Sequence, residues 1–175
     1  EDLAKDVAFT VLDRYRHEIP CFNDDIQGTG AVALAGVLSA CRMNNESMTE
    51  QRIVVFGAGA GGIGVASAIV EGLKREGLDE KEAHARVFVL DSKGLLLDDR
   101  GMDSYKQAFA HTRDSIKDWR FDGQAPNLLE VIENTSATVL LGLSGQTGTF
   151  NQPVVTAMSR NTANPIVFPL SNPTS

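Results

Sequence analysis

The spacing of apolar residues changes along the chain, and each change predicts a different element. Within residues 2–16, apolar side chains recur at helical spacing in two rows, which predicts a helix; the rows are Leu3, Val7, Val11 and Tyr15, and Ala8 and Leu12. Pro20 and the polar residues 23–25 predict a loop. Residues 27–42 are almost wholly small or apolar, which predicts a helix that is buried all round.

A different rhythm follows. Residues 53–56 form a short run rich in β-branched residues and end at Gly57, which is typical of a buried parallel strand. Further strands are predicted over residues 86–90, 137–141 and 166–170, and helices from the glycine-rich turn to Arg75 and over residues 128–134 and 153–160. Residues 92–126 are expected to form a polar excursion with one short helix. This alternation predicts an α/β fold with a doubly wound parallel sheet and right-handed connections.

Length and composition limit the alternatives. The 175 residues suffice for one domain with its own core, in which we expect residues 1–50 to form a helical lead-in and residues 51–175 the α/β core. A net charge of −7 disfavours nucleic acid or an anionic membrane as a partner. We expect a fragment without a signal peptide or membrane span, since the sequence begins without Met and lacks a run of eighteen apolar residues. Cys21 and Cys41 show no metal-type spacing, so two free thiols in a reducing cytoplasm are expected.

Residues 57–62 carry the clearest chemical motif. The run Gly57-Ala58-Gly59-Ala60-Gly61-Gly62 fits G-x-G-x-x-G between a predicted strand and a predicted helix. Gly57 would permit the tight turn, Gly59 the close approach of a pyrophosphate, and Gly62 close packing of helix on strand. The free N–H groups at the helix start would bind the phosphates. The motif therefore predicts a Rossmann-type site for a dinucleotide.

Asp91 ends the second predicted strand, where an acidic side chain accepts hydrogen bonds from the adenine ribose. Ser92, Lys93 and Lys106 complicate the prediction, because a hydroxyl and ammonium groups there could bind a 2′-phosphate. Taken singly, each lysine is more simply interpreted as a solvated surface residue. The sequence leaves NAD against NADP open, and Asp91 favours NAD.

Acidic residues near the N-terminus form two pairs, Glu1-Asp2 and Asp24-Asp25. Carboxylates are the ligands that Mg²⁺ and Mn²⁺ prefer. Such residues also complement helix dipoles, form turns or cap helices, so their spacing alone does not establish a metal site.

Several longer sequence motifs resemble those of a known family. Residues 22–29 read F-N-D-D-I-Q-G-T, which is similar to a signature of malic enzymes. The Glu1-Asp2 pair lies where that family has E-D, residues 91–95 resemble its second-strand end, and residues 170–174 look like its L-S-N-P-T motif. The resemblance runs from the first residue to the last. Malolactic enzymes share this framework and remain an alternative, as does a nucleotide-sensing module without catalysis.

The resemblance implies a set of roles. Glu1, Asp2 and Asp25 would hold Mg²⁺ or Mn²⁺, Asp24 would orient a catalytic lysine, and Asn172 would contact the substrate and nicotinamide. The full-length protein would convert L-malate to pyruvate and CO₂ with NAD or NADP, as a cytoplasmic homo-oligomer. The family's tyrosine acid, lysine base and substrate-binding arginine belong to an N-terminal domain outside this chain, so we expect the chain alone to be inactive.

Other reactive side chains receive simpler interpretations. Ser144 lacks the second glycine of a nucleophile elbow, which argues against a hydrolase. The resemblance implies that residues 143–148 flank the nicotinamide ribose. We expect His17, His84 and His111 at the surface, and Trp119 to cover the polar excursion.

Overall fold

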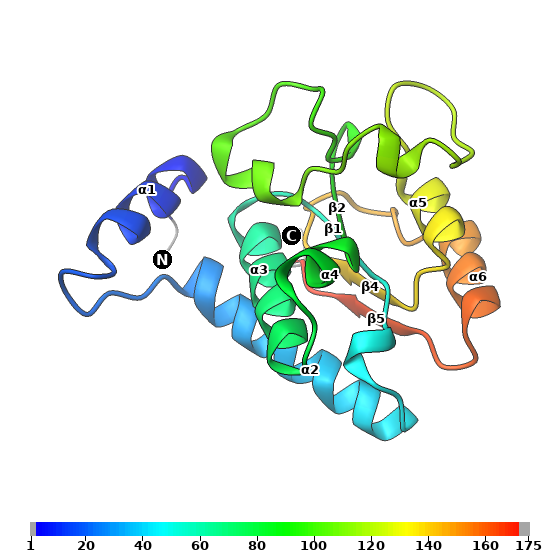
Figure 1. Cartoon of the computed structure of the whole chain (residues 1–175), viewed down its shortest axis with the longest axis horizontal. Coiled ribbons are helices and arrows are strands. Elements are labelled where there is room, and N and C mark those ends of the chain that lie inside the picture. The colour runs from blue at the N-terminus through cyan, green and yellow to red at the C-terminus, as the bar shows by residue number, and fades with distance from the viewer. Residues whose placement is uncertain (1–2, 172–175) are drawn as a thin grey trace.

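A five-stranded sheet of order β3-β2-β1-β4-β5 forms the centre of the computed structural model, which describes residues 3–171 (Figure 1). Four strands are parallel: β1 (Ile53–Phe56), β2 (Val87–Asp91), β4 (Val139–Gly142) and β5 (Ile166–Pro169). The short β3 (Gly94–Leu95) runs antiparallel to β2 at one edge. The predicted parallel sheet is confirmed, and each predicted parallel strand is present.

Helices cover both faces of the sheet (Figure 1). One face carries α2 (Thr29–Asn44), α3 (Ala60–Arg75) and α4 (Glu80–Ala85), and the other carries α5 (Leu128–Thr135) and α6 (Gln152–Asn161). Successive strand residues point to opposite faces. Val55 therefore joins the core beneath α3, whereas Val54 joins the core beneath α5 and α6. This two-sided arrangement is the doubly wound fold that the sequence predicts.

The N-terminal helix α1 (Lys5–Tyr15) buries one of its two apolar rows. Ala8 and Leu12 are 1% and 6% exposed and pack on Ile26. The row of Leu3, Val7 and Val11 lies exposed in the described structure. Helix α1 thus presents an apolar stripe on its outer side.

Residues 24–28 correct the predicted loop. Asp24–Gly28 form a π-helical turn, η1, that runs directly into α2. The Asn23 side chain caps η1 by accepting the Ile26 N–H at 2.9 Å. The polar run that resembled a loop is a capped helix start, because a side-chain oxygen replaces the missing backbone acceptor.

Helix α2 corrects a second prediction, because it is not buried all round. Gly30, Ala33, Val37 and Cys41 form its buried face against the core, but Val32 is 71% exposed. The helix belongs to an outer layer and packs chiefly on α3, so one face alone is covered in the described structure. Both cysteines, which lie within the described range, are free as expected.

The excursion over residues 92–126 is more ordered than its polar composition predicts. It holds β3 and two 3₁₀ turns, η3 (Ser104–Phe109) and η4 (Asp114–Ile116), and a further 3₁₀ turn, η2 (Met48–Glu50), precedes β1. His111, expected at the surface, is largely buried: its ring stacks on Phe88 and Nε2 donates to the Val87 carbonyl over 3.2 Å. Trp119 packs on Phe88 beneath the excursion, which agrees with its predicted covering role.

Helix α4 is an element that periodicity did not predict. Its six residues are too few to establish an apolar repeat, and its start is instead marked by the reciprocal hydrogen bonds of Asp79 and Glu82. None of the helices in the described part of the chain is long and apolar enough to cross a membrane.

Candidate functional site

The glycine-rich turn between β1 and α3 has the three features that its spacing predicts. Gly57 adopts φ +123°, and a Cβ there would lie 2.6 Å from the backbone of Leu143 and Ser144. A Cβ on Gly62 would collide with the Gly57 carbonyl oxygen. A Cβ on Gly59 would meet no other described atom within 4 Å. The outer two glycines therefore allow the backbone to fold tightly, and Gly59 leaves the approach to the turn open.

The start of α3 is suited to bind an anion. Gly59 is the N-cap residue, and no side chain among the described residues caps this end. The first N–H groups of a helix lack intrahelical acceptors, and the helix dipole adds partial positive charge there. Together with the open space above Gly59, this arrangement fits a pyrophosphate.

A cavity of about 660 Å³ extends from this turn to the end of β2. Gly57, Ala58 and Gly59 line one side, and Asp91, Ser92, Lys93, Asp103 and Lys106 line the other. The cavity lies at the carboxyl ends of the strands, beside the point where the chain crosses from one face of the sheet to the other. Ligands of doubly wound α/β domains bind at this position.

Asp91 is held by an arginine, a lysine and a backbone N–H. Its Oδ1 accepts hydrogen bonds from Arg100 Nη2 at 2.9 Å and from the Lys93 N–H at 2.8 Å. Lys106 Nζ lies 3.9 Å from Oδ2 of Asp91 and 3.1 Å from Asp103. The Lys106 side chain is 12% exposed, so its interpretation as a solvated surface lysine is wrong. Two cationic side chains, Arg100 and Lys106, and the Lys93 backbone N–H thus lie against Asp91 where a ribose would bind.

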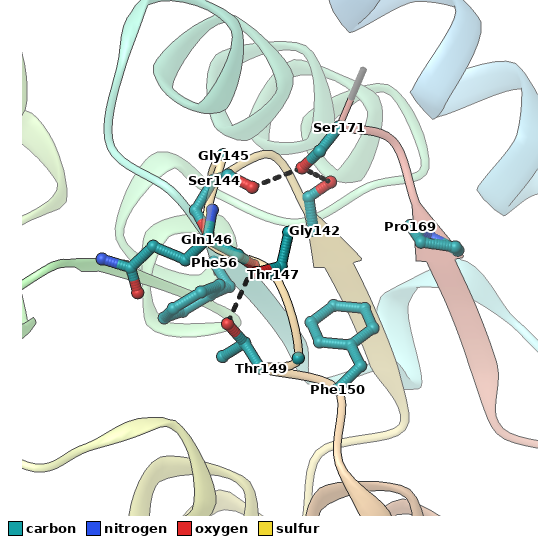
Figure 2. Close-up of a pocket in the computed structure, with 11 residues that line it drawn as sticks. Phe56, Gly142, Ser144, Gly145, Gln146, Thr147, Thr149, Phe150, Pro169 and Ser171 are labelled. Atoms are coloured by element: carbon teal, nitrogen blue, oxygen red, sulfur yellow. Dashed lines mark hydrogen bonds between the residues drawn. The ribbon is translucent and has the colours of Figure 1, made fainter. Parts of the chain in front are cut away.

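A second cavity, of about 340 Å³, lies at the ends of β1, β4 and β5 (Figure 2). Its walls are the rings of Phe56, Phe150 and Pro169 and the loop over residues 144–149. Ser171 Oγ donates to the Ser144 carbonyl at 2.6 Å and so ties the end of β5 to this loop. The loop is therefore anchored between the second cavity and the first, which residues 144–146 also line.

A third cavity, of about 470 Å³, contains Asp25. Ala60, Gly61, Leu143 and Ser171 line it beside Asp25. Because Leu143 also lines the first cavity and Ser171 the second, the three cavities meet around the residues that follow β4. Asp25 thus lies on the same edge of the sheet as the glycine turn.

Of the acidic residues predicted to form a metal site, the structure describes Asp24 and Asp25. Asp25 lies in the third cavity, whereas Asp24 is exposed and its carboxylate lies against Gly28. Glu1, Asp2 and Asn172 lie outside the described residues. Within residues 3–171, no group of three or more His, Cys, Asp or Glu side chains is arranged to hold a metal ion.

Two residues that contribute to this edge were not singled out from the sequence. Arg100 reaches Asp91 because β3 turns the chain back along β2, and its nine-residue separation from Asp91 carries no signal by itself. Asn23 lies within the signature run of residues 22–29, but its capping role depends on the π-helical turn that follows. A polar residue just before a helix is a detectable capping signal. The predicted helix begins at residue 27, however, whereas the helical turn η1 begins at Asp24.

The fold and the site together define a Rossmann-type dinucleotide-binding domain. The sequence matches the family model described as the NAD-binding domain of malic enzyme over residues 26–175. The NAD-dependent malic enzyme of Cronobacter sakazakii is 44% identical over 177 residues, which cover 100% of this chain and 31% of that protein. That of Idiomarina loihiensis is 41% identical over 174 residues, with 99% and 31% covered.

Solved structures give the same result. The malic enzyme of Pyrococcus horikoshii has a TM-score of 0.72 at 27% identity, covering 95% of this chain and 36% of that one. The NAD-dependent malic enzyme of Thermotoga maritima has a TM-score of 0.68 at 28% identity, covering 95% and 40%. The chain belongs to the malic enzyme family and comprises its NAD-binding domain. It spans about a third of the length of the curated relatives.

Proposed function

We propose that this chain binds NAD and serves as the cofactor domain of a full-length protein that oxidatively decarboxylates L-malate. The observation that carries the proposal is the open turn at Gly59, which leads into the uncapped start of α3 and the cavity that ends at Asp91. The pyrophosphate would lie on the start of α3, and Asp91 would accept hydrogen bonds from the adenine ribose. The nicotinamide would extend toward Leu143 and Ser171, where the cavities meet.

The proposed reaction takes L-malate and NAD⁺ to pyruvate, CO₂ and NADH. Bound NAD⁺ would supply the acceptor for the hydride on C2 of malate, and the electrons of the C3–C4 bond would remain on the three-carbon product as CO₂ departs. A bound Mg²⁺ or Mn²⁺ would polarise the C2 oxygen and stabilise the developing enolate. The chain's own contribution is to hold the nicotinamide beside the cavity of Asp25, from which water is displaced as substrate and cofactor fill it.

We propose Glu1, Asp2 and Asp25 as the carboxylates that hold the metal, with Asp24 orienting a lysine supplied by another part of the polypeptide. Asp25 is supported by its place in the third cavity, next to Gly61 of the cofactor turn. Asn172 follows Ser171, which lines that cavity, and would contact the nicotinamide and substrate. Because proton transfer needs groups outside this chain, we expect the 175-residue chain to bind cofactor without turning over malate.

The decisive experiment assays the full-length protein with L-malate, Mn²⁺ and either NAD or NADP. Formation of pyruvate together with an equal amount of reduced cofactor supports the proposal. Formation of lactate without net reduced cofactor would instead identify a malolactic enzyme. Cofactor binding without any conversion of malate would favour a nucleotide-sensing module.

A further inference from the structure

The turn η1 and the first two turns of α3 are in direct backbone contact. A Cβ on Gly64 would lie 2.7 Å from the Cα of Ile26 and 2.8 Å from its carbonyl carbon, and closer still to its carbonyl oxygen. At the start of α2, which continues η1, a Cβ on Gly30 would lie 2.9 Å from the Gly64 carbonyl oxygen. Any side chain at Gly64 must therefore push η1 and α3 apart, because backbone atoms cannot rotate away as a flexible side chain can.

This contact reaches both halves of the proposed site. Gly61 lies one turn before Gly64 on the same face of α3, and a Cβ there would lie 3.5 Å from the carbonyl oxygen of Asp25. Gly61 also belongs to the glycine turn and lines the third cavity with Asp25. The separation of Asp25 from the cofactor turn is consequently set by how closely η1 lies on α3.

Asn23 fixes the N-terminal end of η1. Its side chain is buried, with the residue 5% exposed, and Oδ1 accepts the Ile26 N–H at 2.9 Å. Its backbone N–H donates to Gln27 Oε1 at 3.0 Å, and its carbonyl accepts the Gln27 N–H at 2.8 Å. These three hydrogen bonds hold the π-helical turn in one conformation while Gly64 holds its distance from α3.

We propose that Gly64 and Asn23 are positioning residues, which fix the Asp25 carboxylate relative to the nicotinamide end of the cofactor. The proposal rests on the proposed function. Neither residue lines any of the three cavities at this edge, so each acts through the placement of η1. A displacement of about 1 Å between reacting groups costs on the order of 10²-fold in rate. Gly61 approaches η1, but Gly57 and Gly62, which shape the turn, pack on each other, and Gly57 also packs on the loop after β4.

The first test compares Gly64→Ala with Gly72→Ala in the full-length protein. Gly64 lies in the second turn of α3 and Gly72 in its last turn, where a Cβ would meet the flexible end of the Leu34 side chain at 2.6 Å and is remote from η1. For Gly64→Ala we expect kcat with malate to fall by about 10- to 100-fold and the Mn²⁺ requirement to rise. The Kd for NAD, measured by calorimetry without malate, should stay within about threefold of the unaltered value. Gly72→Ala should leave all three quantities near their unaltered values.

The second test uses Asn23, which keeps the proposal testable if Gly64→Ala does not fold. Asn23→Ala removes the capping oxygen, whereas Asn23→Asp retains it. We expect Asn23→Ala to accelerate amide hydrogen exchange at Ile26 and Gln27 and to lower kcat, and Asn23→Asp to restore both. The exchange measurement reports on η1 independently of turnover.

The outcomes separate two failures. Unaltered kcat and Mn²⁺ dependence in a folded Gly64→Ala protein, or in Asn23→Ala, would overturn the positioning proposal alone. A loss of NAD affinity as large as the loss of kcat would also overturn it, because the contact would then support the whole cofactor fold. Failure of the unaltered full-length protein to bind NAD would overturn the proposed function.

Discussion

The Asp91 carboxylate and the Arg100 guanidinium form an ion pair, with Oδ1 and Nη2 2.9 Å apart and both side chains 19% exposed. The pair links the end of β2 to the chain that returns after β3. Because Lys106 also approaches this carboxylate, the acidic residue that would receive the adenine ribose already lies beside two cationic side chains. Cofactor selectivity should therefore be sensitive to the charge of Asp91.

We predict that Asp91→Asn weakens NAD binding about tenfold and shifts the preference of the chain toward NADP. The amide accepts hydrogen bonds less strongly than a carboxylate, and hydrogen bonds to charged groups contribute about 1.5–3 kcal/mol. The variant also leaves Arg100 and Lys106 without the anion that they share, which favours a 2′-phosphate. Calorimetric Kd values for both cofactors check this expectation.

The matched control is Asp114→Asn, which removes the same charge from a side chain that is 90% exposed. Because Asp114 lines none of the cavities at the site, its replacement should change neither Kd appreciably. An unchanged ratio of the two Kd values in Asp91→Asn would show that this carboxylate does not select the cofactor.

We predict that Gly59→Val abolishes NAD binding, while Gly59→Ala weakens it less. Both side chains enter the open space above the turn, and the larger one blocks the approach of the pyrophosphate. The thermal midpoint should change little in either variant, since a Cβ at this position meets no described atom within 4 Å. Binding of NAD to Gly59→Val at the unaltered affinity would mean that the phosphates lie elsewhere.

For the full-length protein, we predict that Asp25→Asn strongly lowers the rate of malate decarboxylation and raises the required Mn²⁺ concentration. The amide keeps the shape of the side chain but removes the negative charge that a hard divalent cation prefers. NAD affinity should persist, because the glycine turn is unaltered. Titration of the rate with Mn²⁺, together with the Kd for NAD, measures both effects.

Asp24→Asn provides the comparison for Asp25→Asn. Asp24 is exposed beside Gly28 and does not line the third cavity, so its replacement should impair proton transfer while changing the Mn²⁺ requirement less. Equal effects of the two substitutions on the Mn²⁺ requirement would contradict the separate roles that we propose for them.

A pH dependence of stability follows from His111. Burial lowers the pKa of His111 below its ordinary value of 6.5, and the hydrogen bond to the Val87 carbonyl opposes this effect only in part. The unfolded chain therefore binds more protons than the folded chain as pH falls below about 6.5. The free energy of unfolding should decrease over that range, with a contribution of at most about 1.4 kcal/mol per pH unit from this group.

Denaturant unfolding of the chain at several pH values, compared with His111→Gln, measures this contribution. Gln cannot titrate but can still donate a hydrogen bond to the Val87 carbonyl. The variant should lose the part of the pH dependence that lies below about pH 6.5. Identical pH profiles for both chains would show that another group controls acid stability.

How far the sequence predicts the molecule depends on the range of the interactions involved. The strand over residues 53–56 and the turn at Gly57 were predictable because a β-branched run followed by glycines is a local pattern. The sequence predicts helix α2 but not its burial. Helix α3 covers only one side of α2, and Val32 lies exposed on another side. Lys106 and His111 were assigned to the surface because their polar neighbours suggest solvent, whereas the excursion folds back on β2.

By itself, the sequence determined the alternating strands and helices, the doubly wound class and the position of the cofactor turn. Each of these depends on residues within a few positions of one another, where backbone sterics and apolar periodicity act directly. Only the tertiary structure decided that Arg100 pairs with Asp91, and that Gly64 brings the backbone of Ile26 against α3. Those contacts join segments whose separation in space is set by packing. The order of residues along the chain does not specify that separation.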